Sequence, residues 1–222
     1  MALAVACADD DLRPLDPAEE RLVQAATPKR VMDFRLGRHC AHAALRTLGI
    51  SVPALLRDED RAPAWPTGIV GSITHGAGMG AAVVALDKAV RGLGIDVERA
   101  RNALPRGVWR LVFTAEEEAF LSGLSDEAAE RTAHVWFSLK ESAFKAAHGA
   151  WRIGPPLRRI ALEPGTWSFP DPFGGTGATL RLDDGRVLSG CWLSDGARVV
   201  SSAVVPAPST DGSSSPSCGL ER

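Results

Sequence analysis

Early in the chain, apolar positions recur with the spacing of a helix. From Phe34 to Leu48 apolar side chains return every three or four positions, which places them on one helical face. Thr27 is a good N-cap residue, and Gly49 is typical of the position just past a helix end. The pattern predicts a helix over residues 27–48 that packs one face on a core.

Shorter apolar runs follow, and residues typical of turns bound them, so we interpret them as strands. The predicted strands before the middle of the chain are 69–74, 79–86 and 91–98. Those near its end are 158–162, 178–182, 187–193 and 199–205. Between the two groups, Thr114 and Glu117 fit a capping box that opens a helix through Leu121, and a second helix is predicted over residues 128–148.

The order of a helix followed by strands therefore occurs twice. We expect an N-terminal half over residues 1–90 and a C-terminal half over residues 91–205, although no sequence repeat proves a duplication. Residues 206–222 are rich in Ser, Pro and Gly, which predicts a disordered tail.

Charged residues in two of these predicted elements suggest a site. Asp96 and Glu98 are two positions apart in a strand and share a face. Glu141 and Lys145 are four apart in a helix and share a stripe. Magnesium prefers a few hard oxygen ligands and completes its shell with water and phosphate oxygens, so this set indicates phosphate-transfer chemistry. Alone, each short string is more often a solvated charge pair, but their joint occurrence favours a site.

One cation interrupts the apolar face of the first predicted helix. Arg38 lies within the stripe, and a buried guanidinium needs an anionic partner or a route to water. The sequence therefore predicts an anion beside Arg38.

Composition narrows the class of protein. The formal net charge of −2 over 222 residues gives no global field for nucleic acid or a membrane surface. No apolar run reaches the ~20 residues of a membrane span. The first eight residues are mildly apolar but lack a basic start and precede Asp9, so we expect no signal peptide. The four scattered cysteines suit reduced thiols in a cytoplasmic protein.

Five motifs occur in a fixed order along the chain. They are Arg30 with 33–34 (DF) and 37–41 (GRHCA), then 64–68 (AWPTG), 71–75 (GSITH), 94–98 (GIDVE) and 140–145 (KESAFK). Together they resemble the 4′-phosphopantetheinyl transferases of the surfactin- and enterobactin-synthetase type. The resemblance implies an α+β fold of two similar halves related by a pseudo-twofold axis, with coenzyme A in the cleft between them.

The resemblance also implies an activity. The family moves the phosphopantetheine arm of coenzyme A to a serine of a carrier protein, here an acyl or peptidyl carrier domain of polyketide or non-ribosomal peptide synthesis. A fatty-acid carrier is a further option. The chain is longer than the short trimeric transferases of fatty-acid synthesis, so a monomer with two internal halves is expected.

Matching positions imply the metal site and the catalytic residues. Asp96, Glu98 and Glu141 correspond to magnesium ligands, with the carbonyl of Val97 facing the metal or its water. Glu141 is the candidate general base, acting directly or through a metal-bound water, and Lys145 would bind the diphosphate or protonate the leaving group. Lys140 is a second-rank phosphate ligand. These side chains are expected to converge on one divalent cation.

Other matching positions imply contacts with coenzyme A. Thr74 and His75 correspond to the diphosphate contact, and Arg30 and Arg38 to the 3′-phosphate contact, for which paired guanidinium N–H groups are well suited. For Arg38 the alternative is an ion pair between helices. Contacts to the adenine and ribose fall in the loop 57–61, chiefly on Arg57 and with Asp60 as a further member.

Some alternatives stay open. The arginines between the two metal motifs, at positions 99, 101, 106 and 110, fit either an acidic carrier or a solvated loop. After Lys145 the chain departs from the family pattern over residues 146–153, which leaves the enclosure of the pantetheine arm open. Another magnesium-dependent phosphate-transfer enzyme or hydrolase, or a non-catalytic carrier-binding module, are the competing functions.

Overall fold

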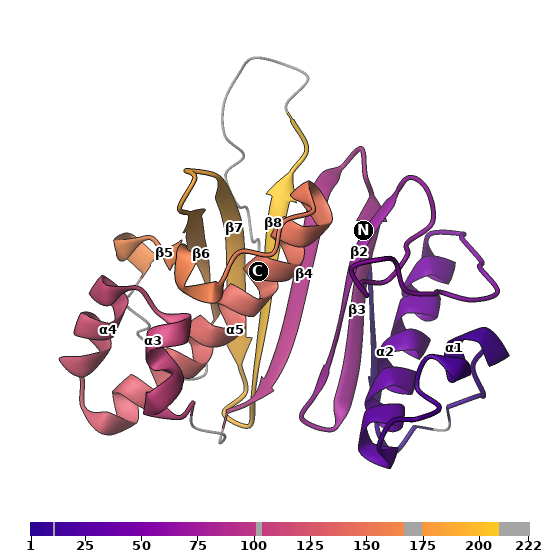
Figure 1. The fold of residues 1–222 in the computed structure, drawn as a ribbon, viewed down its shortest axis with the longest axis horizontal. Helices are drawn as coiled ribbons and strands as arrows, with labels where there is room; N and C mark the ends of the chain where they lie inside the picture. Colours follow the sequence, from indigo (N-terminus) through magenta and orange to yellow (C-terminus); the bar gives the residue numbers. More distant parts are fainter. Residues whose placement is uncertain (11, 101–103, 167–174, 209–222) are drawn as a thin grey trace.

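The computed structural model describes residues 1–10, 12–100, 104–166 and 175–208. The chain folds as two antiparallel sheets, each with a long helix against one face, which confirms the expected α+β class (Figure 1). None of the helices in these ranges is long and apolar enough to cross a membrane. The predicted tail falls mostly on residues outside these ranges.

Helices and strands appear in the following order. The helices are α1 (Pro17–Arg21), α2 (Pro28–Thr47), α3 (Trp109–Val112), α4 (Ala115–Ser122) and α5 (Asp126–Trp151), with 3-10 turns at Arg106–Val108, Leu157–Arg159 and Pro164–Thr166. The strands are β1 (Ala2–Cys7), β2 (Ile69–Gly76), β3 (Met79–Leu86), β4 (Val90–Arg99), β5 (Ile160–Leu162), β6 (Gly175–Leu182), β7 (Val187–Ser194) and β8 (Arg198–Pro206).

The N-terminal half is a sheet of order β1-β3-β2 with α2 packed on one face. The Thr27 side chain accepts the N–H of Arg30 and caps α2 at the predicted residue. Phe34, Ala41 and Leu45 are buried, as the helical spacing requires. The predicted helix is thus confirmed to within a residue at each end.

The C-terminal half is a sheet of order β4-β8-β7-β6-β5 with α5 lying across it. Trp136, Leu139 and Ala143 are fully buried against this sheet. The predicted capping box is present: Thr114 accepts the N–H of Glu117, and the Glu117 carboxylate accepts the N–H of Thr114. The helix α5 is longer than the predicted 128–148, because Ser125 caps it earlier and it continues to Trp151.

The two halves meet where the edge strands β2 and β4 lie side by side. Side-chain hydroxyls join them. Ser72 Oγ accepts the backbone N–H of Ile95 at 3.1 Å, and Thr74 Oγ1 accepts that of Val97 at 3.2 Å. The N–H groups of Ile95 and Val97 are thereby bonded across the junction by β2 side chains, which places the Asp96 motif between the halves.

Two glycines let α5 lie directly on β4. A Cβ at Gly94 would stand 1.7 Å from the carbonyl oxygen of Ser142, and one at Gly92 would stand 2.2 Å from that of Ala146. Both glycines share a strand face with Asp96. Four helical residues rise ~6 Å and two strand residues ~6.7 Å, so Ser138, one turn before Ser142, falls over Asp96.

Two of the observed elements were not predicted from the sequence. The strand β1 occupies the start that was read only as mildly apolar, and α1 was not predicted. In β1 the small residues Ala2 and Ala4 face inward, whereas Leu3 and Val5 are 60% and 53% exposed. Because large apolar side chains point outward, the usual strand pattern is inverted and gives no signal.

Candidate functional site

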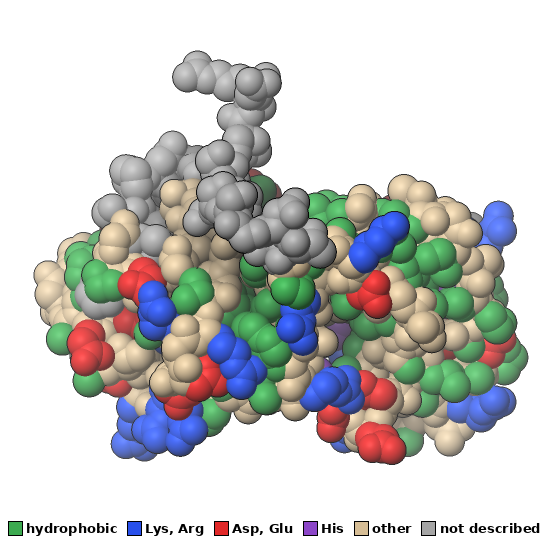
Figure 2. All heavy atoms as spheres, turned by 90° about the horizontal axis from the view of Figure 1, so that it is seen from above, with side chains coloured by type: hydrophobic (Ala, Val, Ile, Leu, Met, Phe, Trp, Pro, Cys, Tyr) green, Lys and Arg blue, Asp and Glu red, His purple; other side chains and the backbone are tan. Residues whose placement is uncertain are grey.

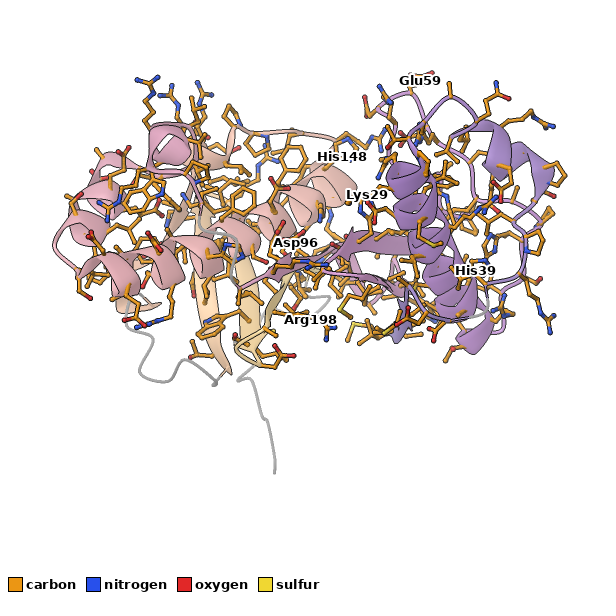
Figure 3. The ribbon with its side chains drawn as sticks, turned by 90° about the horizontal axis from the view of Figure 1, so that it is seen from below. Lys29, His39, Glu59, Asp96, His148 and Arg198 are labelled. Carbon is orange, nitrogen blue, oxygen red and sulfur yellow. The ribbon has the colours of Figure 1, made fainter. Side chains whose placement is uncertain are left out.

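Asp96 lies at the centre of the candidate site, in the junction between the halves (Figure 3). Its Oδ1 accepts from Lys145 Nζ at 2.7 Å and from Thr74 Oγ1 at 3.3 Å. Its Oδ2 accepts from Ser138 Oγ at 3.0 Å. Residues from β2 and α5 therefore meet on one carboxylate of β4, so neither half forms this site alone.

Lys145 is brought to Asp96 by its place on α5. Its Nζ also donates to the carbonyl of Ile95 at 3.0 Å, and the side chain keeps 26% exposure. Thus the cation reaches both the buried strand and the solvent side of the junction. Thr74 accepts from Val97 and donates to Asp96, so both of its hydrogen-bonding roles are taken by β4. A diphosphate contact by Thr74 remains a prediction.

Glu98 and Glu141 flank Asp96 as half-buried carboxylates. Burial raises the pKa of Glu98 to about 7, and the charges of Asp96 and Glu141 add to the rise while Lys145 opposes it. Burial also raises the pKa of Glu141, with Lys145 lowering it and Asp96 raising it. The three carboxylates therefore act on one another electrostatically, as like charges in a partly desolvated site do.

The expected metal site is only partly formed by these side-chain positions. Within the described ranges, no three carboxylate, histidine or cysteine side chains lie close enough together to hold a metal ion. Asp96 is held by Lys145 instead. The donor set still fits a hard divalent cation in kind, because burial raises the pKa of Glu98 and that of Glu141, Asp96 adds to both rises, and a cation would offset that negative charge.

Val97 presents its carbonyl to the other half. A Cβ at Gly76 would lie 2.7 Å from that oxygen, so the carbonyl faces the end of β2. Its assignment as a metal ligand remains a prediction.

Arg30 and His75 form a second part of the site. Arg30 Nη1 lies 2.6 Å from His75 Nε2, which joins the start of α2 to the end of β2. Burial lowers the pKa of His75, and the charge of Arg30 lowers it further, so a neutral imidazole accepts from the guanidinium. Two residues expected to contact coenzyme A are thus neighbours.

Arg57 adds positive charge next to this pair. Its guanidinium lies 5.5 Å from the centre of the Phe34 ring. Burial lowers the pKa of Arg57, and the nearby charges of Arg61 and Arg30 lower it further. In the part of the chain that is described, no carboxylate forms an ion pair with Arg30 or Arg57. A polyanion with several phosphates suits such a cluster.

Arg38 has a different partner from the one expected. Its Nε lies 3.5 Å from Glu19 on α1, with both side chains almost fully buried, and its Nη2 donates to the carbonyl of Leu56. Burial lowers the pKa of Arg38 to about 10, and Glu19 opposes that shift. The required anion is therefore Glu19, an ion pair between helices, and a 3′-phosphate contact by Arg38 stays a prediction.

Comparison with known proteins identifies the family. Residues 18–85 match the 4′-phosphopantetheinyl transferase N-terminal domain, and residues 92–194 match the 4′-phosphopantetheinyl transferase superfamily. The 4′-phosphopantetheinyl transferase Svp of Streptomyces mobaraensis is 37% identical over 213 residues, which cover 90% of this chain and 82% of Svp. The chain belongs to the 4′-phosphopantetheinyl transferase family. The expected resemblance is confirmed.

Two further proteins are similar in sequence to this transferase. The 4′-phosphopantetheinyl transferase PptT of Mycobacterium tuberculosis (strain ATCC 25618 / H37Rv) is 37% identical over 184 residues, or 81% of this chain and 77% of PptT. Enterobactin synthase component D of Escherichia coli O157:H7 is 36% identical over 129 residues, or 56% of this chain and 58% of that protein.

Lys140 of the transferase is not a phosphate ligand, and that expectation was wrong. Its Nζ is completely buried, 2.5 Å from Glu117 Oε2 and 2.9 Å from the carbonyl of Val112. Glu117 also accepts the N–H of Leu162. Burial lowers the pKa of Lys140 while Glu117 raises it. The pair ties α4 and β5 to α5 on the side away from Asp96.

Asp60 of the transferase pairs across the junction. Arg152, the C-cap of α5, contacts Asp58 at 2.8 Å and Asp60 at 2.5 Å, and His148 lies 3.3 Å from Asp60. These contacts span a cavity of about 550 Å³. Both halves line it, including Trp65, Ile73, Phe144, Lys145, His148 and Arg152. A role of Asp60 toward the nucleotide stays a prediction.

The molecular surface also shows a hollow at the junction of the two halves. The molecule is hollowed where the halves meet, with acidic and basic side chains adjacent on the rim (Figure 2). A cavity of about 590 Å³ on the outer face of the N-terminal half is lined by Arg13, His39 and Arg46. His39 lies on the side of α2 away from Asp96, so this outer cavity is separate from the junction (Figure 3).

The basic segment after β4 is only partly described. Arg101 lies outside the described ranges. Arg106 pairs with Asp126 at 2.5 Å and stacks on the Trp109 ring, whereas Leu111 beside them is 62% exposed. Carrier docking and a solvated surface therefore both remain predictions here.

Sequence reasoning missed several participants of the site. Arg152 was noted only as part of a departure from the family pattern, and Ser142 and Ser201 were not singled out. Ser138 and Ser142 are four apart on α5, which is a signal for a shared face. Nothing in the sequence places Ser201 of β8 beside them.

Proposed function

We propose that this transferase moves the 4′-phosphopantetheine arm of coenzyme A to a serine of an apo carrier protein, giving holo carrier and 3′,5′-ADP. The observation that carries the proposal is the Asp96–Lys145 pair at 2.7 Å, flanked by Glu98 and Glu141, with the Arg30–His75 contact near Lys145. Acidic ligands beside a phosphate-binding cluster are what a metal-assisted diphosphate reaction requires.

The metal-binding residues in this proposal are Asp96, Glu98 and Glu141, with the Val97 carbonyl nearby. Mg²⁺ bound there would offset the charge that grows on the departing diphosphate oxygens. The three carboxylates act on one another electrostatically, and Lys145 supplies a positive charge next to Asp96.

The proposed transfer needs one base and one leaving group. The carrier serine oxygen forms a bond to the phosphorus that bears pantetheine, and the bond from that phosphorus to the oxygen of 3′,5′-ADP breaks. Glu141 takes the serine proton, as the carboxylate on α5 one turn before Lys145. Lys145, partly exposed, neutralises the departing phosphate.

Coenzyme A binding is proposed along the basic cluster. Arg30, His75 and Arg57 line the N-terminal side of the junction and would bind its phosphates. We propose carrier domains of polyketide or non-ribosomal peptide synthesis as acceptors, since relatives include a component of enterobactin synthase. One copy supplies both halves of the site, so we also propose a monomer, and the scattered cysteines favour a cytoplasmic location.

One assay tests the function. The protein is incubated with coenzyme A, MgCl₂ and an apo carrier, and the carrier is weighed by mass spectrometry. A gain of one phosphopantetheine group supports transfer. Release of 3′,5′-ADP with an unmodified carrier would instead show hydrolysis, and an unmodified carrier without release would show at most binding. Omission of MgCl₂ with added chelator is the control for metal dependence.

A further inference from the structure

Three buried hydroxyl groups lie next to the Asp96 carboxylate, between α5 and the neighbouring strand β8. Ser138 and Ser142 belong to α5 and are fully buried, and Ser201 belongs to β8 and is 1% exposed. Ser201 is the residue of β8 paired in register with Asp96, so both side chains point toward α5. Ser138 Oγ lies 2.8 Å from Ser201 Oγ, which lies 2.7 Å from Ser142 Oγ.

The number of hydroxyl protons indicates which serine donates in each hydrogen bond of this cluster. A carboxylate paired with a lysine only accepts, so the single Ser138 proton goes to Asp96 Oδ2. The contact between Ser138 and Ser201 then needs the Ser201 proton, and the contact between Ser201 and Ser142 needs that of Ser142. Each short contact between hydroxyls receives one proton only if Ser142 donates to Ser201 Oγ, Ser201 to Ser138, and Ser138 to Asp96. Ser142 Oγ also donates to the Ser201 carbonyl at 3.1 Å, so its proton is shared between two acceptors of the same residue.

The direction has a physical consequence. Hydroxyls in a chain polarise one another, so the last donor binds its acceptor more strongly than an isolated serine does. Asp96 thus accepts a hydrogen bond at Oδ2 from the row of three hydroxyls and one at Oδ1 from Thr74, and both hydrogen bonds are buried. Lys145 is its only partly exposed partner among these contacts. It can therefore leave Asp96 for a phosphate without releasing the carboxylate.

We propose that Ser142, Ser201 and Ser138 form a directed hydroxyl relay that fixes the orientation of the Asp96 carboxylate. They are positioning residues, because they act through Asp96. The proposal rests on the proposed function for its catalytic meaning, whereas the orientation of Asp96 can be measured without that function.

The first test is structural and needs no activity. A high-resolution crystal structure of Ser138→Ala is compared with that of the unaltered chain. We expect the Asp96 carboxylate to rotate or to occupy more than one conformer, with Lys145 still paired to it. An unchanged, single Asp96 conformer would overturn the relay, whatever the protein catalyses.

The second test measures metal binding. Mn²⁺ is titrated calorimetrically into each variant in the presence of coenzyme A, and unfolding by urea is measured in parallel. Partners behind a metal ligand typically change affinity ~10–100-fold, so Ser138→Ala is expected to raise the Mn²⁺ Kd about tenfold, with smaller rises for Ser201→Ala and then Ser142→Ala. Ser201→Thr, which keeps the hydroxyl, is expected to restore affinity relative to Ser201→Ala.

Two controls on β8 separate the relay from general packing. Ser202→Ala removes the neighbouring hydroxyl, which contacts Cys191 on the opposite face, and should change neither quantity. Val205→Ala opens a buried position on the relay's own face of the strand and should lower stability without changing the Mn²⁺ Kd. Equal losses of affinity in Val205→Ala and Ser138→Ala would overturn the proposal.

Failure of the proposed function can be distinguished from failure of the hydroxyl relay. If the unaltered protein neither binds Mn²⁺ with coenzyme A nor modifies a carrier, the function is wrong, and the crystal structure of Ser138→Ala still decides the relay. If the unaltered protein does both and Ser138→Ala matches it in Kd and kcat, the function stands and the relay is wrong.

Discussion

Lys145 forms its ion pair with Asp96 on the neighbouring strand, at 2.7 Å, rather than with Glu141 one turn away on its own helix. Spacing along α5 favours the local pair, but the glycines of β4 bring the helix close enough for the strand carboxylate to take the cation. The most important contact of the site is thus one between elements. The following predictions test what this arrangement does.

Removing the Lys145 cation should slow transfer strongly. For Lys145→Ala we expect kcat/KM to fall by about 100–1,000-fold, the range for loss of one preorganised charge at a transition state. Initial rates of holo-carrier formation measure this. Lys29→Ala, which removes an exposed lysine paired with Asp33, is the matched control and should retain the rate. A modest loss in Lys145→Ala, similar to that control, would contradict the assigned role.

The carboxylate group should make stability depend on pH. Glu98 has a folded pKa of about 7, above its unfolded value, so the folded state binds more protons between about pH 4.5 and pH 7. Stability without metal should therefore fall as pH rises through this window, by about 1 kcal/mol after allowing for solvent screening. Urea unfolding at pH 5 and pH 7.5 with chelator measures the difference.

Two changes should flatten that pH dependence. Glu98→Gln removes the titrating group, and added MgCl₂ offsets the negative charge around it. A slope that is unchanged in Glu98→Gln would show that another group causes it.

Lys140 should matter for stability rather than for substrate binding. Lys140→Met leaves Glu117 charged and completely buried, which typically costs about 3–5 kcal/mol of unfolding free energy. The double variant Lys140→Met/Glu117→Gln should recover part of this, because no unpaired charge remains. Urea unfolding of both variants tests the pair. Normal stability with a raised KM for coenzyme A would instead restore the phosphate-ligand interpretation.

Gly94 should tolerate no side chain. In Gly94→Ala the new Cβ would stand 1.7 Å from the Ser142 carbonyl oxygen, and neither backbone can move aside easily. We expect a loss of about 3 kcal/mol or more, since overpacking here separates α5 from β4. Gly107→Ala has nothing within 4 Å of the added atom and is the neutral comparison in the same unfolding experiment.

The contact between Arg152 and the two aspartates should affect coenzyme A binding more than stability. Exposed ion pairs contribute within ~1 kcal/mol, so Arg152→Gln should unfold almost normally. The loop that carries Arg57 loses an anchor, and the KM for coenzyme A should rise severalfold with little change in kcat. Arg181→Gln breaks an exposed pair with Glu163 outside the junction and should leave KM unaltered.

The sequence by itself determined most local structure of this transferase. Thr27 and the capping box at Thr114 start helices where predicted, and the apolar periodicity of α2 and the spacing of the late strands were sufficient to locate those elements. Such signals depend on neighbours in the chain, so they can be read without a fold. The motifs also named Asp96, Glu98, Glu141 and Lys145 as a group.

Only the tertiary structure decided which partner each charge has. Lys140 and Lys145 belong to one motif, yet one is buried against Glu117 and the other reaches Asp96, because α5 packs different faces on different elements. Arg38 pairs with Glu19. Ser201 joins the site only because β8 lies next to β4. Ion pairs and hydrogen bonds act over a few ångströms, and distances of that size between remote segments are set by packing.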